Sequence, residues 1–153
     1  MTRHSFTMAA ILTLAAVPIV AADWGYVSPV IGKTPAGASI KGTMEIETSS
    51  VVQTGSLVKA WFRKTYKKDV VDPVNPARPI RRMKLLYGHH CDAHQRALLQ
   101  IIYEDAAGET VYTATFPEET AKFEVVIPDT TGEAWLEAAC RIAAMKRTAG
   151  AKP

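Results

Sequence analysis

Five residues whose side chains bind metals or transfer protons lie together in the sequence: His89, His90, Cys91, Asp92 and His94. Imidazole, thiolate and carboxylate groups are all ligands of zinc and copper. If the segment is a strand, His90 and His94 lie roughly 13 Å apart at about 3.3 Å per residue, too far for both to bind one ion. If it is a helix, the two histidines share a face and can bind one together. We interpret the cluster as solvated polar residues on a sheet face, and predict neither a metal site nor a cofactor.

The same cluster contains one candidate acid–base pair. Asp92 and His94 would point to the same side of a strand, and a carboxylate beside an imidazole can transfer protons. Residues of such common types occur at this spacing often by chance. The sequence has no Gly-x-Ser-x-Gly elbow and no glycine-rich phosphate loop. We therefore predict a protein that is not an enzyme and has no catalytic residues.

Charge is distributed unevenly along the chain. The formal net charge of the 153 residues is +3. Residues 59–84 contain nine basic and two acidic residues, a net charge of +7, whereas the rest of residues 23–153 contains eight basic and thirteen acidic residues, a net charge of −5. Such a field can attract an acidic protein patch, a sulfated glycan or an anionic lipid.

Residues 59–84 are therefore the candidate partner-binding segment. The residues that we expect to contact a partner are Lys59, Trp61, Arg63, Lys64, Lys67, Lys68, Arg81, Arg82 and Lys84. Aromatic rings beside lysines and arginines contribute cation–π contacts and often anchor interfaces, which is why Trp61 is included. The alternative is a solvated basic loop with Trp61 in the core.

The first 22 residues are typical of a secretory signal peptide. A basic start at Arg3 and His4 precedes an apolar stretch from Met8 to Val20 and two small residues, Ala21 and Ala22. The apolar stretch is too short to span a bilayer, for which about 20 residues are needed. A retained N-terminal anchor is the alternative. The expected location is the periplasm or the cell surface, or the medium outside the cell, where nucleic acid is a poor candidate partner.

Export determines how the two cysteines are interpreted. In an oxidising compartment two cysteines with no others in the chain are expected to form one disulfide, here between Cys91 and Cys140. The alternative is a pair of buried free thiols.

The chain is long enough for one domain, which we expect over residues 23–147, followed by a flexible tail at 148–153. β-branched and aromatic residues predict strands over 46–52, 57–66, 83–87, 109–116 and 123–127. Residues 53–56 are typical of a hairpin turn, and residues 74–79 contain two prolines and are predicted to be a loop.

Two further segments bear on the fold. Thr130 as N-cap and Glu133 three residues later form a capping box, and Trp135, Leu136, Ala139, Cys140 and Ala143 recur at helical spacing, so a helix is predicted there. Residues 92–104 fit either a helix or a strand. We favour the strand, because its alternation puts Cys91, Ala97 and Ile101 on one apolar face that Cys140 could meet.

The order of these features is also that of a known family. A segment with an acidic residue and two serines, Glu47–Val51, precedes a strand that carries a tryptophan, Val58–Trp61. The pair Cys91-Asp92 and the hairpin residues Tyr103 and Gly108 follow. Residues Ile127–Thr131 then open a helix that carries Cys140. This pattern resembles the bacterial surface-adhesin protein E family over nearly all of residues 24–143.

The resemblance implies an α+β fold, an antiparallel sheet of about five to six strands with a C-terminal helix on one face, tied to it by the Cys91–Cys140 bridge. It also implies adhesion to host proteins. The sequence departs from the family in having no cysteine for lipid attachment after the signal peptide. We expect a secreted, non-enzymatic binding protein that contacts host or matrix molecules; the alternative is a periplasmic envelope-accessory protein.

Overall fold

The structure of the protein, a computed structural model, describes residues 22–34, 37–71 and 77–150. The predicted signal peptide therefore lies outside the described residues, apart from Ala22. The strands are β1 (Trp24–Lys33), β2 (Ser39–Glu47), β3 (Val52–Thr54), β4 (Leu57–Val70), β5 (Ile80–His90), β6 (Gln95–Glu104), β7 (Thr110–Thr115) and β8 (Glu124–Val125). A 3₁₀ turn, η1 (Glu118–Thr120), and one long helix, α1 (Thr131–Gly150), complete the described part.

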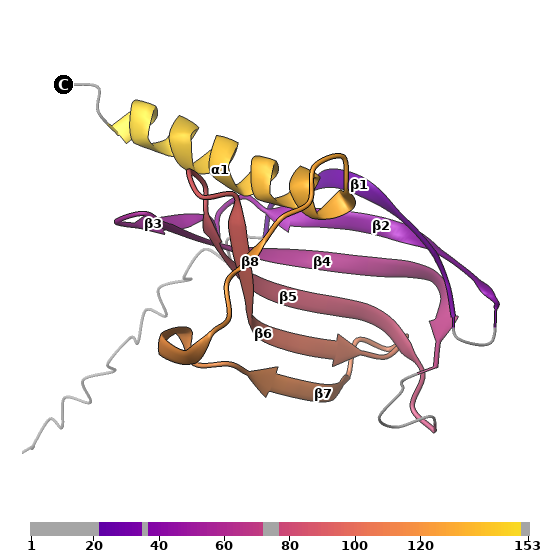
Figure 1. Cartoon of the computed structure of the whole chain (residues 1–153). Helices are drawn as coiled ribbons and strands as arrows, with labels where there is room; N and C mark the ends of the chain where they lie inside the picture. Colours follow the sequence, from indigo (N-terminus) through magenta and orange to yellow (C-terminus); the bar gives the residue numbers. More distant parts are fainter. Residues whose placement is uncertain (1–21, 35–36, 72–76, 151–153) are drawn as a thin grey trace, which may run out of the picture.

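All of these strands form one antiparallel sheet. The strand order is β1-β2-β4-β5-β6-β7, with β3 paired to β4 and β8 paired to β6. Helix α1 lies across one face of the sheet near β1 and β2, and β7 forms the edge far from the helix (Figure 1). The predicted α+β class, with a sheet and a C-terminal helix on one face, is confirmed.

Local signals explain the start and the orientation of α1. The Thr130 hydroxyl accepts a hydrogen bond from the Glu133 amide at 3.4 Å, and the Glu133 carboxylate accepts one from the Asp129 amide at 2.7 Å. This is a capping box that closes one residue earlier than predicted. Trp135 and Leu136 are buried on the side that faces the sheet, as the helical spacing predicts.

The hydrophobic core lies between α1 and the sheet. Its buried members come from every central strand and from the helix: Met44, Ile46, Val58, Ala60, Phe62, Leu85, Ile101, Trp135, Ala139 and Ala143. Phe62 is at its centre, with its ring 5.9 Å from that of Trp135. Burial of these side chains at about 25 cal/mol per Å² of apolar surface is the main force that holds the helix on the sheet.

The predicted disulfide between Cys91 and Cys140 is confirmed. It joins the end of β5 to the middle of α1. The strand interpretation of residues 95–104 is also confirmed. However, residues 91–94 form a turn rather than the start of that strand, since His94 has a φ of 50° and its amide donates to the Cys91 carbonyl. Cys91 meets the helix from this turn, and not through strand alternation.

One strand prediction is wrong, and two strands were missed. Residues 46–52 do not form one strand, because the chain turns after Glu47, where the Ser50 hydroxyl and amide both donate to the Glu47 carbonyl. Strands β1 and β2 were not predicted. Strand β1 contains Pro29 and glycines, which weaken the sequence signal for a strand. Pro29 is tolerated because β1 is an edge strand of the sheet.

Strands β4 and β5 and helix α1 extend beyond their predicted bounds. Strand β4 continues to Val70 and β5 begins at Ile80, so the basic segment is mostly strand and not loop. Helix α1 continues through Gly150, into the segment predicted as a flexible tail. Residues 72–76 of the proline-containing segment and residues 151–153 of the tail lie outside the described residues.

Candidate binding surface

Strand alternation sorts the basic segment onto two faces of the sheet. Phe62 faces α1, so its neighbours Trp61 and Arg63 point to the opposite side, which we call the outer face. The Arg63 guanidinium lies 4.2 Å from the centre of the Trp24 ring, which belongs to β1. Trp61 is half-buried on the outer face, so it is not a residue of the core beneath the helix.

Six of the nine basic side chains in residues 59–84 are already paired. The ion pairs are Lys59–Glu118, Arg63–Glu45 at 2.9 Å, Arg78–Asp105 at 3.7 Å, Arg81–Asp69 at 2.6 Å, Arg82–Glu104 at 2.9 Å and Lys84–Glu104 at 2.5 Å. Glu104 is buried and holds two cations at once. Four carboxylates from outside residues 59–84, those of Glu45, Glu104, Asp105 and Glu118, therefore offset part of the +7 charge of this segment.

The paired cations surround a shallow pocket on the outer face. Its volume is about 340 Å³, and it is lined by Trp24, Trp61, Arg63, Arg82, Lys84, Glu47, Ile102 and Ala22. Two indole rings and three cations thus meet on one surface. Such a surface can stack on flat or apolar groups, although its charge is balanced.

Lys64 lies on the other side of the sheet. Its Nζ is 5.0 Å from the centre of the Trp135 ring, beneath α1. Burial, and then the positive charge of Arg96, lower the pKa of Lys64. The sheet therefore separates Lys64 from the predicted partner-binding residues of the outer face, which are Lys59, Trp61, Arg63, Arg82 and Lys84.

Two lysines at the far end of β4 are different. Strand β4 pairs with β2 only as far as Tyr66, and its pairing with β5 is interrupted between Thr65 and Val70. Lys67 and Lys68 lie in this interval and are exposed. Neither forms an ion pair with a described residue.

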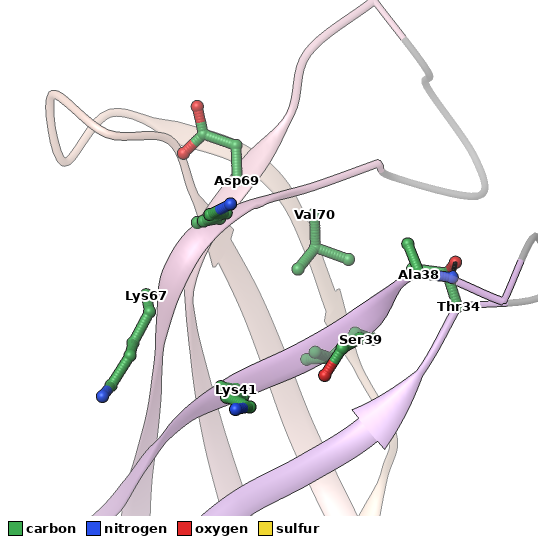
Figure 2. A pocket seen from close by; sticks show the side chains of 9 residues that line it. Thr34, Ala38, Ser39, Lys41, Lys67, Asp69 and Val70 are labelled. Atoms are coloured by element: carbon green, nitrogen blue, oxygen red, sulfur yellow. Dashed lines mark hydrogen bonds between the residues drawn. The ribbon is translucent and has the colours of Figure 1, made fainter.

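Lys67 and Lys68 border a second pocket together with Lys41 from β2 (Figure 2). We call these three residues the lysine rim. The pocket has a volume of about 440 Å³ and is also lined by Thr34, Ala38, Ser39, Ile40, Asp69 and Val70. Lys67 and the Asp69 carboxylate point away from each other in Figure 2, and Asp69 is paired with Arg81. The rim thus has three cations and one carboxylate that is already neutralised.

Gly42 explains how β2 and β4 come together beside the rim. A side chain at this position would place its Cβ 2.2 Å from the Thr65 carbonyl oxygen. Only glycine permits this approach of the two backbones. The contact lies next to Lys41 on β2 and just before Lys67 on β4. Sequence reasoning missed Lys41 and Trp24, because it did not predict the strands that carry them.

The histidine cluster does not form a site. His89 is fully buried in the core, so it is not solvated as the sequence interpretation proposed. The His90 ring packs on Phe123 with 4.5 Å between ring centres, and Cys91 is in the disulfide. In the described ranges, no three or more His, Cys, Asp or Glu residues are grouped so that they could hold a metal ion.

Comparison with known proteins places this fold in a family. Residues 33–141 match the family model described as surface-adhesin protein E. The chain belongs to the surface-adhesin protein E family. This confirms the resemblance inferred from the sequence, and it makes the protein adhesin-like, as a member of a family of adhesins and not of enzymes.

A solved structure shows the same fold. Crystal form II of Haemophilus influenzae protein E matches with a TM-score of 0.52 and 13% sequence identity, covering 86% of this chain and 99% of that chain. Another structure of Haemophilus influenzae protein E has a TM-score of 0.49 and 19% identity, covering 84% and 91% of the two chains. No curated protein sequence matches the chain. Within the described residues, no helix of this adhesin E family member is long and apolar enough to cross a membrane.

Proposed function

We propose that this adhesin E family protein is an exported, non-enzymatic binding protein that attaches to a sulfated glycan or a similar polyanion of a host or its matrix through the lysine rim. The observation that supports this most directly is the contrast within the basic segment. Six cations of residues 59–84 are held by carboxylates, whereas Lys67 and Lys68, like Lys41 on β2, have no ion-pair partner among the described residues. Binding a polyanion at the rim therefore breaks no ion pair between described residues.

The chemistry of the rim suits a sulfated chain. Three flexible ammonium groups at an open pocket give several adjustable contacts to sulfate or carboxylate groups, without the fixed geometry that a single small ligand needs. Attraction of this kind is screened by salt, with a Debye length of about 8 Å at physiological ionic strength. The proposal therefore requires binding that weakens as salt is added.

The outer-face pocket can extend the contact. The cations that line it are paired with carboxylates, so they contribute hydrogen bonds more than net attraction; they are Arg63, Arg82 and Lys84. Trp61 contributes stacking. Of the predicted site residues, we therefore assign the electrostatic part of binding to Lys67 and Lys68, and a secondary role to the outer face.

Chromatography on immobilised heparin tests the proposal. The double variant Lys67→Gln/Lys68→Gln is compared with Arg141→Gln/Arg147→Gln, which removes two exposed charges from α1 instead. We expect the wild type and the helix variant to elute at the same salt concentration, and the rim variant to elute at a clearly lower one. Equal shifts for both variants, or retention that does not depend on salt, would contradict binding at the rim.

A further inference from the structure

A third pocket lies at the edge of the sheet, away from both surfaces described above. Strand β6 pairs with β7 between residues 100 and 104 and with β8 at Gln95 and Arg96, so residues 97–99 lie between the two ladders. The connection from β7 to β8 passes this interval, and together they line an open pocket of about 490 Å³, which we call the edge pocket. Its size is in the range of small-molecule sites.

Arg96 forms one wall of the edge pocket, and flat contacts hold it in place. The Cζ atom of its guanidinium is 5.1 Å from the centres of both the Tyr87 and the Trp135 rings. A Cβ added to Gly132 would lie 3.0 Å from the same atom, so the guanidinium also packs on the first turn of α1. Packing therefore fixes the orientation of this charge without a carboxylate.

The charge of Arg96 is not balanced. Its Nη1 is buried and has no hydrogen-bond partner, and Arg96 takes part in none of the ion pairs among the described residues. No carboxylate offsets this charge at its neighbours, since the positive charge of Arg96 contributes, after burial, to lowering the pKa of both Lys64 and His89. A partly buried cation without a partner is costly, so an anion that reaches it is stabilised.

The rest of the lining limits what that anion can be. Arg96 and Lys122 bring two positive charges and Glu124 brings one negative charge, which leaves a net charge of +1. Apolar surface comes from Leu98, Phe116 and other residues of the two walls. The pocket thus combines one unmatched positive charge with apolar surface from Leu98 and Phe116.

We propose that the edge pocket binds a small organic monoanion, a carboxylate carried on an aromatic or aliphatic body. The carboxylate would accept hydrogen bonds from the Arg96 guanidinium, and the body would pack on Leu98 and Phe116. This site is separate from the lysine rim, because it uses β6 and the β7–β8 connection and none of the rim residues.

Benzoate is a suitable probe, and benzamide is its neutral counterpart of almost the same shape. Amide chemical shifts in a ¹H–¹⁵N NMR titration report binding residue by residue. We expect saturable shifts for benzoate in β6 and in the β7–β8 connection, with benzamide at least about tenfold weaker because a charge-assisted hydrogen bond contributes roughly 1.5–3 kcal/mol. Equal binding of both compounds, or no saturable shift at these residues, would overturn the proposal.

Variants of Lys122 and Glu124 with opposite expected effects distinguish a change in binding from a disturbed fold. Arg96→Met should abolish benzoate binding, but Arg96 also supports α1. Lys122 and Glu124 are exposed, so Lys122→Gln and Glu124→Gln should both fold normally. We expect Lys122→Gln to weaken benzoate binding and Glu124→Gln to strengthen it, each by about threefold, since exposed charge pairs contribute under about 1 kcal/mol. Changes in the same direction, or no change in either variant, would refute the assignment.

Discussion

At the residue scale, the His89 imidazole lies inside the core, and neither ring nitrogen is hydrogen bonded to a described residue. It packs against the rings of Phe62 and Tyr87, at 5.7 and 6.0 Å between ring centres. Burial, and then the positive charge of Arg96, lower the pKa of His89 to about 3 from the ordinary 6.5. The folded protein therefore keeps this side chain neutral at pH values where the unfolded chain binds a proton.

This predicts a specific loss of stability in acid. Between pH 6.5 and pH 3 the unfolded state binds more protons at this site, so the free energy of unfolding falls as the pH falls, by up to about 1.4 kcal/mol per pH unit. Urea unfolding of the wild type and of His89→Phe at pH 6.5 and 4.5 measures it. We expect the wild type to lose about 2 kcal/mol more than the variant over this interval.

Both proteins share the same carboxylates. Comparing how the free energy of unfolding changes with pH in the two proteins therefore removes the contribution of those groups. Parallel stability curves for wild type and His89→Phe would show that His89 is not held neutral by the fold. The sequence could not have predicted this environment, because a histidine next to another histidine at a strand end has the same pattern whether it points inward or outward.

At the scale of elements, the β2–β4 contact depends on a residue without a side chain. A Cβ at Gly42 would overlap the Thr65 carbonyl oxygen, whereas one at Gly32 on β1 would meet no atom within 4 Å. Gly42→Ala should lower the free energy of unfolding by roughly 1–3 kcal/mol or more, as overpacking does, and Gly32→Ala should change it little. Urea unfolding of both variants measures the difference, and equal effects would contradict the close approach.

The disulfide couples α1 to the sheet across a long stretch of chain. Cys91 and Cys140 are 49 residues apart in sequence, and closing such a loop in the unfolded chain stabilises the fold by about 4 kcal/mol in the chain-entropy model. We expect Cys91→Ala/Cys140→Ala to unfold at a clearly lower urea concentration. Wild type in a reducing agent is the control and should match the variant. A loss below about 1 kcal/mol would mean that packing of Trp135 and Leu136 alone fixes the helix.

Elements differ in how well the sequence predicted them. Helix α1 and the hairpin through Gly55 have strong local signals, a capping box and a glycine with a φ of 58°, and both were predicted. Strands β1 and β2 were missed because their pairing with one another and with β4, more than their own composition, makes them strands. Tertiary pairing is not visible in a short window of sequence.

At the scale of the whole molecule, the sequence shows which charges exist but not which are neutralised. The +7 segment looked uniform, yet its members are divided among the outer face, the core beneath α1 and the exposed end of β4. Glu104 and Glu45 lie on other strands, and the register that brings them to Arg82 and Arg63 follows from long-range pairing. The family was predictable from the order of its motifs along the chain, and the disulfide was predictable because the chain has two cysteines.

At this scale we propose that the adhesin E family protein works outside the cell with the lysine rim accessible. The two cysteines of the chain are joined, so an introduced cysteine is the only thiol. Lys68→Cys places that thiol on the rim, at the opposite end of β4 from the disulfide. Cells that produce this variant are treated with a membrane-impermeant maleimide, before and after the outer membrane is opened.

We predict equal labelling of intact and opened cells, as expected for a rim that faces the surroundings of the cell. A known periplasmic protein with one free thiol is the control, and it should be labelled only in opened cells. Labelling of Lys68→Cys only after the outer membrane is opened would contradict the central claim, and would favour instead a periplasmic envelope-accessory protein.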